Sequence, residues 1–405
     1  MARNRFLAVL VATVTVIIVF YPEIAFRASL DGLKLWFEIV LPALLPFFVM
    51  ADLLMGLGVV HFVGSLLEPI MKPLFKIPGV GGFAVAMGLA GGYPLGAKIT
   101  GELERARLIT PTEAERLVSF ANTADPLFMI GAVAVGMFNR PELGATLVIA
   151  HYLGAVLVGF CMRLHKGSES PPLSRQGGYF SRALRALDRG RKEDGRPFGR
   201  LFGEIVQNTF QSMLFIGGCI MIFSVLVQVI GATGLLTPVR LGIAKLLTLL
   251  RLDSNLATAV VNGFFETTLG AQTASRSLAP IEAKATIASL VIGWSGLSVH
   301  GQVAAMLAGT KARLRPYLAA RCLHGIFAAL LTALLLGPAR FIPVYLVKAV
   351  PALNQPTYLD GNFAARFLAA ARLAASLTLM LVAVLSLIWL VKRIIYISFR
   401  SGHKY

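Results

Sequence analysis

Apolar runs long enough to cross a bilayer recur along this chain of 405 residues. A membrane-spanning helix needs about 20 consecutive apolar residues. Hydrophobic residues make up 56% of the chain and charged residues 14%, whereas globular domains carry roughly 25% charged residues. The sequence therefore predicts an all-α polytopic membrane protein with about eight spanning helices. These cover residues 6–26, 33–58, 116–139, 142–163, 201–230, 285–310, 316–337 and 363–391.

The net charge of +18 has a membrane explanation. Lys and Arg collect in cytoplasmic loops, where they fix orientation and meet anionic headgroups. The basic stretches at 164–200, 311–315 and the C-terminal tail fall on one side if eight helices cross and both termini are cytoplasmic. No zinc-finger spacing or RNP motif is present, so we expect the lipid bilayer as a partner and no nucleic acid.

Two further apolar stretches, 79–100 and 254–275, are interrupted by Gly, Pro and polar residues. The charge distribution fits only if each enters and leaves the membrane on the same side, as a re-entrant helical hairpin. Free backbone groups at a hairpin tip cannot be satisfied by lipid, so each tip must face a water-filled cavity or a ligand.

The two halves of the chain repeat one another weakly but in order. "FEIV" at 37–40 matches "GEIV" at 203–206, and "GGYPLGAK" at 91–98 matches "FETTLGAQ" at 265–272. "PTEA" at 111–114 matches "PIEA" at 280–283, and a polar-interrupted helix follows each. The first hairpin is predicted to enter the membrane from the cytoplasm and the second from outside. The repeats are therefore inverted, which is the architecture of secondary transporters.

This pattern predicts five regions. They are an N-terminal transmembrane helix (1–30), repeat 1 (31–163), a flexible basic cytoplasmic linker (164–200), repeat 2 (201–340), and a C-terminal transmembrane helix with a basic tail (341–405).

The hairpin tips and the helix breaks are the predicted substrate site. Glycine lets the backbone turn and approach a ligand closely, and half-helix N-termini favour anions. The candidate substrate-binding residues are Gly91, Gly92, Tyr93, Pro94, Gly96, Lys98, Asn122, Thr123, Asp125, Glu266, Thr267, Thr268, Gly270, Gln272, Ser295 and Ser298.

Several of these residues have a structural alternative. Lys98 could pair with a substrate carboxylate or extend to the headgroups. Glu266 could bind substrate, carry a proton or coordinate Na⁺, or it could cap the second half-helix. Asp125, before Pro126, could bind substrate or cap a helix. His300 has no second His or Cys near it at metal-ligand spacing, so no metal site is predicted.

The stretches "GGYPLGAKIT", "TPTEAERLVSFANTADPLFMIG" and "GFFETTLGAQ" resemble the sporulation integral membrane protein YlbJ family, between residues 30 and 340. Those proteins contain a nucleoside-recognition or Gate domain. The resemblance implies a fold similar to that of concentrative nucleoside transporters, in which hairpin tips and broken helices bind substrate. Carried onto this chain, it implies a set of site residues that comprises Gly91, Gly92, Tyr93, Pro94, Asn122, Thr123, Glu266, Thr267, Ser295 and Ser298.

The same resemblance implies a role. The family is associated with moving dipicolinate, a small aromatic dicarboxylate, from mother cell toward forespore. It implies the bacterial cytoplasmic membrane as the location, and the outer forespore membrane in an organism that sporulates.

Three function classes remain open. They are a transporter or facilitator of a small organic anion, a nucleoside transporter coupled to H⁺ or Na⁺, and a non-transporting scaffold for a sporulation complex. Polar breaks at matched positions in both halves favour transport, because a scaffold does not need them. The sequence contains no HExxH, no GxSxG and no convincing nucleophile–base pair, so no enzyme is predicted. We expect a small-molecule substrate and no cofactor beyond a coupling ion, and a homo-oligomer stays open.

Overall fold

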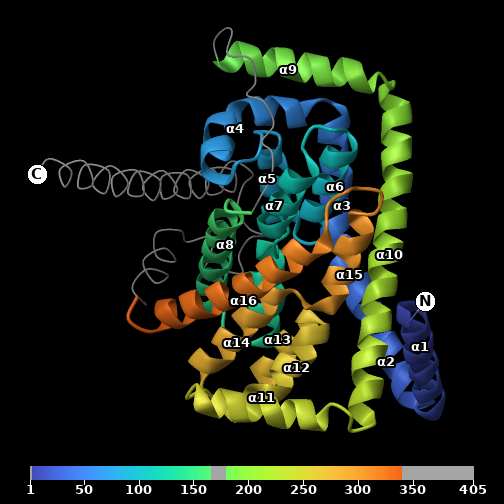
Figure 1. Cartoon of the computed structure of the whole chain (residues 1–405), viewed down its shortest axis with the longest axis vertical. Coiled ribbons are helices and arrows are strands. Elements are labelled where there is room, and N and C mark those ends of the chain that lie inside the picture. Colours follow the sequence, from blue (N-terminus) through green and yellow to red (C-terminus); the bar gives the residue numbers. More distant parts are fainter. Residues whose placement is uncertain (1, 166–178, 340–405) are drawn as a thin grey trace, which may run out of the picture. The chain divides into compact units, whose positions relative to one another are not determined.

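The structure is a computed structural model that describes residues 2–165 and 179–339 (Figure 1). Every regular element in these ranges is a helix, which confirms the all-α prediction. The elements of the first half are α1 (Ala2–Phe20), α2 (Pro22–Leu35), the π-helix η1 (Trp36–Val40), α3 (Leu41–Gly56), α4 (Val59–Phe75), α5 (Gly81–Gly91), α6 (Leu95–Arg105), α7 (Pro111–Ala121), the π-helix η2 (Leu127–Met137) and α8 (Leu143–Met162).

The second half follows the same order after one additional helix. Its elements are α9 (Tyr179–Asp194), α10 (Phe198–Ala232), α11 (Thr237–Leu249), the 3₁₀-helix η3 (Ser254–Leu256), α12 (Ala257–Phe265), α13 (Thr267–Arg276), α14 (Ile281–Trp294), α15 (Gly296–Met306) and α16 (Leu314–Leu336). Each half thus contains a hairpin (α5–α6 or α12–α13), a broken helix (α7–η2 or α14–α15) and a long final helix (α8 or α16).

Four helical spans among the described residues are long and apolar enough to cross a membrane, and two bent helix pairs raise that number to six. The four are α8, α10, α14 with α15, and α16. They coincide with the predicted spans 142–163, 201–230, 285–310 and 316–337. The predicted span 363–391 and the whole predicted C-terminal region 341–405 lie outside the described residues. The total number of crossings and the cytoplasmic placement of both termini stay predictions.

The N-terminal helix differs from its prediction. A single helix was expected over 6–26, but α1 ends at Phe20 and the chain bends by 103° into α2. Pro22 explains the break, because proline cannot donate a backbone hydrogen bond and suits the first turn of a new helix. The chain then stays helical from α2 through η1 to the end of α3.

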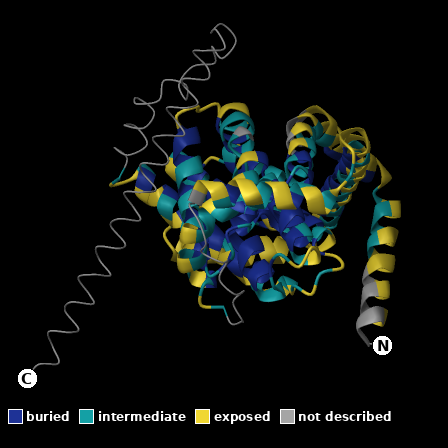
Figure 2. Ribbon diagram, turned by 90° about the horizontal axis from the view of Figure 1, so that it is seen from above, coloured by how far each residue is buried: buried dark blue, intermediate teal, exposed yellow. Residues whose placement is uncertain are grey.

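The predicted hairpins and breaks are present as local structure. The arms α5 and α6 pack against each other, as do α12 and α13. The predicted helix 116–139 is interrupted at Asn122–Pro126, between α7 and η2. The second break is confined to Ser295, and Ser298 lies inside α15. Buried residues face the interior of this assembly and exposed residues lie on its outer helices (Figure 2).

The prediction of a flexible linker is wrong for residues 179–194, which form α9. This helix packs against α4 through small residues: Ala183 is fully buried, and a Cβ at Gly190 would lie 2.2 Å from the His61 ring. The many charges of this stretch concealed its helical period. Residues 166–178 of the predicted linker lie outside the described residues.

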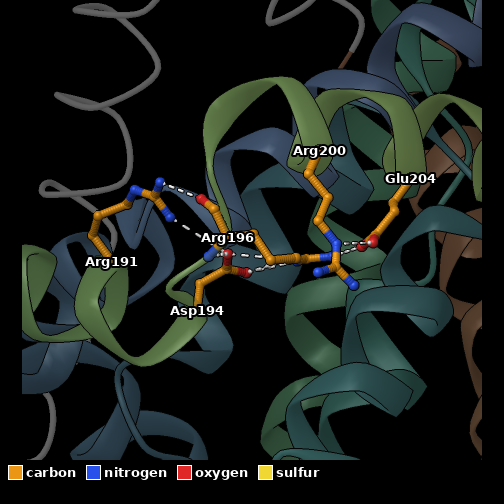
Figure 3. Close-up of polar contacts among 5 residues, drawn as sticks. All are labelled: Arg191, Asp194, Arg196, Arg200 and Glu204. Carbon is orange, nitrogen blue, oxygen red and sulfur yellow. Dashed lines mark hydrogen bonds and ion pairs between the residues drawn. The ribbon is translucent and has the colours of Figure 1, made fainter.

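The turn from α9 into α10 is held by a network of ion pairs (Figure 3). Arg196 contacts Asp194 at 2.6 Å and Glu204 at 2.8 Å. Arg191 donates a 2.6 Å hydrogen bond to the Arg196 carbonyl, and Arg200 pairs with Glu204 at 2.7 Å. These contacts join the end of α9 to the first two turns of α10.

Candidate functional site

The tip of the first hairpin packs against the break in the helix that follows it. A Cβ at Gly88 would lie 1.9 Å from the Ala121 carbonyl oxygen, and one at Gly96 would lie 2.1 Å from the same atom. Gly92 has a φ of +74°, and a Cβ there would meet the Asp125 carboxylate at 2.6 Å. Only glycine allows this close approach, so the tip sequence is explained by its contact with the broken helix.

The first break is tied to its surroundings by side chains. Thr123 donates a 3.0 Å hydrogen bond to the Gly88 carbonyl. Asp125 accepts a 2.9 Å hydrogen bond from the Phe128 amide and so caps η2. The Asn122 side-chain amide donates to the Tyr317 hydroxyl at 3.1 Å. These hydrogen bonds therefore hold the backbone between α7 and η2 in a non-helical conformation.

The second hairpin repeats this arrangement. A Cβ at Gly296 would lie 3.0 Å from the Phe265 carbonyl oxygen, and one at Gly270 would lie 2.3 Å from the Gly263 Cα. Glu266 is buried and accepts a 2.7 Å hydrogen bond from the Leu269 amide, which is the capping geometry considered from the sequence. Ser295, at the break itself, has a φ of +72°.

The other predicted residues of the two tips differ in burial. Gly91, Thr267 and Gly270 are buried, whereas Tyr93, Thr268 and Gln272 are partly buried. Pro94 precedes the first residue of α6. The structure thus gathers the predicted residues of each half around the tip and break of that half.

Lys98 points away from the tip. Its ammonium lies 2.5 Å from Asp52 on α3 and 3.9 Å from Glu102 on its own helix. The Lys98 and Asp52 side chains are only 8% and 12% exposed, so this is a buried ion pair. The positive charge predicted to meet a substrate carboxylate is therefore balanced within the protein.

The two halves meet through α16. Tyr93, at the first tip, donates a 2.9 Å hydrogen bond to the Ile292 carbonyl in α14. Arg321 on α16 donates to the Asn122 carbonyl at 3.0 Å and reaches the Ile292 carbonyl at 3.5 Å. Tyr317, one turn earlier on α16, accepts the hydrogen bond from the Asn122 side chain. One helix therefore contacts both breaks.

Sequence reasoning missed these α16 residues. Tyr317, Arg321 and His324 follow one another at intervals of four and three, which places them on one face of a helix. All three are fully buried. The spacing of these residues in the sequence indicates a polar helix face. The span was assigned from its many apolar residues, so this face was overlooked.

One histidine contacts Arg321, and two more lie near the helix breaks. His324 contacts the Arg321 guanidinium through Nδ1 at 2.7 Å and the His151 carbonyl through Nε2 at 2.8 Å. The His151 Nε2 accepts a 3.0 Å hydrogen bond from the Ala124 amide. His300 contacts the Trp294 carbonyl at 2.8 Å. In the described ranges, no three His, Cys, Asp or Glu residues are grouped as metal ligands.

A second set of contacts between the halves lies at the loops before α7 and α16. Arg313 pairs with Glu115 at 2.7 Å, and His165 contacts the same carboxylate at 2.6 Å. Burial alone would raise the pKa of Glu115, but hydrogen bonds from Arg313 and His165 lower it to about 2. Arg105 donates to the Met306 carbonyl at 3.1 Å. These contacts place the loop at 106–110 beside the basic stretch 311–315, both predicted to be cytoplasmic.

Known proteins are similar in sequence to parts of this chain. A family model described as Gate: Nucleoside recognition matches residues 37–156. The sporulation integral membrane protein YlbJ of Bacillus subtilis (strain 168) is 42% identical over 328 residues, which cover 80% of each chain. An uncharacterized protein of Alkalihalophilus pseudofirmus is 29% identical over 162 residues, covering 38% of this chain and 32% of that protein.

Solved structures are similar at lower identity. A variant of CNTnw in an outward-facing state has a TM-score of 0.40 and 15% identity, covering 84% of this chain and 86% of that chain. CNTnw in an inward-facing substrate-bound state has a TM-score of 0.39 and 15% identity, covering 83% and 86%.

Proposed function

Because this chain belongs to the YlbJ family of sporulation integral membrane proteins, and is a multi-pass membrane protein, we propose that it transports or facilitates the passage of a small organic anion. The proposed anion is dipicolinate during spore formation, and the proposed route is alternating access between the two halves. The proposed cellular location is the bacterial cytoplasmic membrane, or the outer forespore membrane where the organism sporulates.

One observation carries the transport proposal. In each half a hairpin tip is packed against a helix break, and Tyr93 and Arg321 link the first tip and break to α14 of the second half. Open backbone at membrane depth is tolerated only where protein buries it or a polar cavity meets it. Two such places joined across the repeat interface are the arrangement in which transporters bind substrate. A scaffold has no use for it.

An anion also suits the direction of the membrane potential. An inside-negative potential drives anions outward with about 2.3 kcal/mol per charge per 100 mV. Export of an organic anion from the cytoplasm would therefore proceed without a coupling ion.

Reconstituted protein tests the proposal. Proteoliposomes loaded with labelled dipicolinate should lose the label with saturable kinetics, whereas protein-free liposomes should retain it. A parallel set loaded with labelled uridine measures the nucleoside alternative. Saturable loss of uridine alone would contradict the anion proposal. Retention of both solutes would contradict transport and favour the scaffold.

Cysteine labelling tests the inverted orientation. The native Cys161, Cys219 and Cys322 are replaced by Ser, and single cysteines are placed at Leu278→Cys and Ala106→Cys, both at exposed ends of hairpin arms. An impermeant reagent added outside intact cells should label the first and spare the second. The reverse result would overturn the proposed topology.

A further inference from the structure

We infer that the Arg321 guanidinium is the cationic anchor for a carboxylate of the transported anion. This inference deepens the proposed function and rests on it. Arg321 lies on α16 between the two helix breaks, at a position that sequence reasoning did not select. Its contacts, burial and charge balance carry the inference.

Arg321 keeps an uncompensated charge. The residue is 0% exposed, and none of the ion pairs among the described residues involves it. Its neighbour His324 donates from Nε2 to the His151 carbonyl and accepts from Arg321 at Nδ1, so that imidazole is neutral. A buried charge is costly unless it is paired. An anionic ligand would supply the missing pair.

The free edge of the guanidinium has the shape that a carboxylate needs. Nη1 is occupied by the Asn122 carbonyl at 3.0 Å and His324 at 2.7 Å. Nη2 has only the long 3.5 Å contact to the Ile292 carbonyl, and Nε has no hydrogen-bond partner. Nε and Nη2 form one side of the guanidinium fork, which binds carboxylates through two parallel hydrogen bonds.

Other buried polar atoms near the breaks also lack partners. They are Asn122 Oδ1, His151 Nδ1, Ser298 Oγ and His300 Nδ1. Buried polar atoms are normally hydrogen-bonded, so unpaired ones need an explanation. His151 accepts at Nε2, which leaves a proton on Nδ1, and Ser298 carries a hydroxyl proton. Both atoms are hydrogen-bond donors, which is the kind of group that a carboxylate accepts from.

Substitutions can separate the role of the Arg321 charge from the role of its bidentate geometry. Arg321→Lys keeps the cation and removes the two-pronged geometry, whereas Arg321→Gln removes the charge. Ser298→Ala removes an unpartnered hydroxyl, so it leaves the hydrogen bonds of the fold intact. Arg27→Gln, which removes a guanidinium that is 76% exposed, is the matched control.

Two readouts are measured for each variant. The first is efflux of labelled dipicolinate from proteoliposomes, and the second is thermal stabilisation of the solubilised protein by dipicolinate compared with its neutral diamide. We expect Arg321→Lys to raise the KM at least about tenfold with a smaller change in maximal rate, because hydrogen bonds to charged groups are strong. Arg321→Gln should abolish stabilisation by dipicolinate. Ser298→Ala should raise the KM about threefold, and Arg27→Gln should match the wild type.

The outcomes distinguish the inference from the proposed function. Wild-type protein that is stabilised by dipicolinate through Arg321 but transports none would overturn the transport proposal and keep the site. Transport with unchanged KM and unchanged stabilisation in Arg321→Lys and Ser298→Ala would overturn the site, even if Arg321→Gln fails to fold. Equal stabilisation of the wild type by the acid and its diamide would also overturn it.

Discussion

Lys98 and Arg321 are two buried cations that this fold treats in opposite ways. The Lys98 ammonium has a carboxylate at 2.5 Å and a second at 3.9 Å. Arg321 contacts only carbonyls, an imidazole and an aromatic ring. Lys98 follows the hairpin tip in sequence, yet its charge is already balanced. The comparison teaches that charge balance, and not proximity to a tip, identifies the residue suited to an anionic ligand.

The largest expected effect comes from removing the carboxylate partner of Lys98, so that its charge is left unpaired like that of Arg321. Asp52→Leu leaves the Lys98 ammonium buried beside only the more distant Glu102. Breaking a buried ion pair by removing one partner costs about 3–5 kcal/mol, so the free energy of unfolding in detergent should fall by that amount. The double variant Asp52→Leu with Lys98→Met should recover most of it. A single variant as stable as the wild type would show that the pair makes no net contribution to stability.

A smaller effect is expected at the partly exposed ion pair of Glu115. Its pKa is about 2 in the fold and 4.5 as the ordinary value. The stabilisation is therefore present above the ordinary value and is lost as pH falls from there toward about 2. Because Arg313 is 69% exposed, Glu115→Gln should cost only about 1–2 kcal/mol near neutral pH. Denaturation across this pH range should show the difference between variant and wild type shrinking with acid. A constant difference would contradict the ion-pair assignment.

The reverse exchange gives Arg321 a carboxylate of its own. Asn122→Asp places an acidic side chain on the residue whose backbone carbonyl Arg321 already contacts. Internal neutralisation should weaken stabilisation by dipicolinate about tenfold, which corresponds to about 1.4 kcal/mol. Asn122→Ser, which adds no charge, is the control. Stronger binding in the acidic variant would break the comparison.

The smallest effect is expected at Glu266. It tests whether this carboxylate has a role beyond capping α13, such as balancing the charge of Arg321. The buried Glu266 carboxylate caps α13 through the Leu269 amide. Loss of a helix cap costs about 1 kcal/mol, so Glu266→Gln should reduce the free energy of unfolding by no more than that. A loss as large as that of Asp52→Leu would show that Glu266 does more than cap α13.

The hairpins and breaks could be predicted because Gly, Pro and polar residues interrupt apolar runs locally. The Gly92 turn and the interruption at Asn122 need no distant information. The partner of Lys98 could not be predicted, because Asp52 is 46 residues away and only helix packing brings the two together. Arg321 was missed for a different reason: the spanning pattern of α16 was assigned from its apolar residues, and its polar face was not read.

The connection between α9 and α10 has a mechanical consequence. α9 packs on α4 of the first half, and α10 begins the second half only a few residues later. Gly195, with a φ of +66°, is the left-handed residue of that connection, and Arg196 bridges Asp194 and Glu204 across it. A displacement of α10 relative to α9 must change the backbone at Gly195 or break the ion pairs of Arg196. These ion pairs therefore oppose movement at the junction.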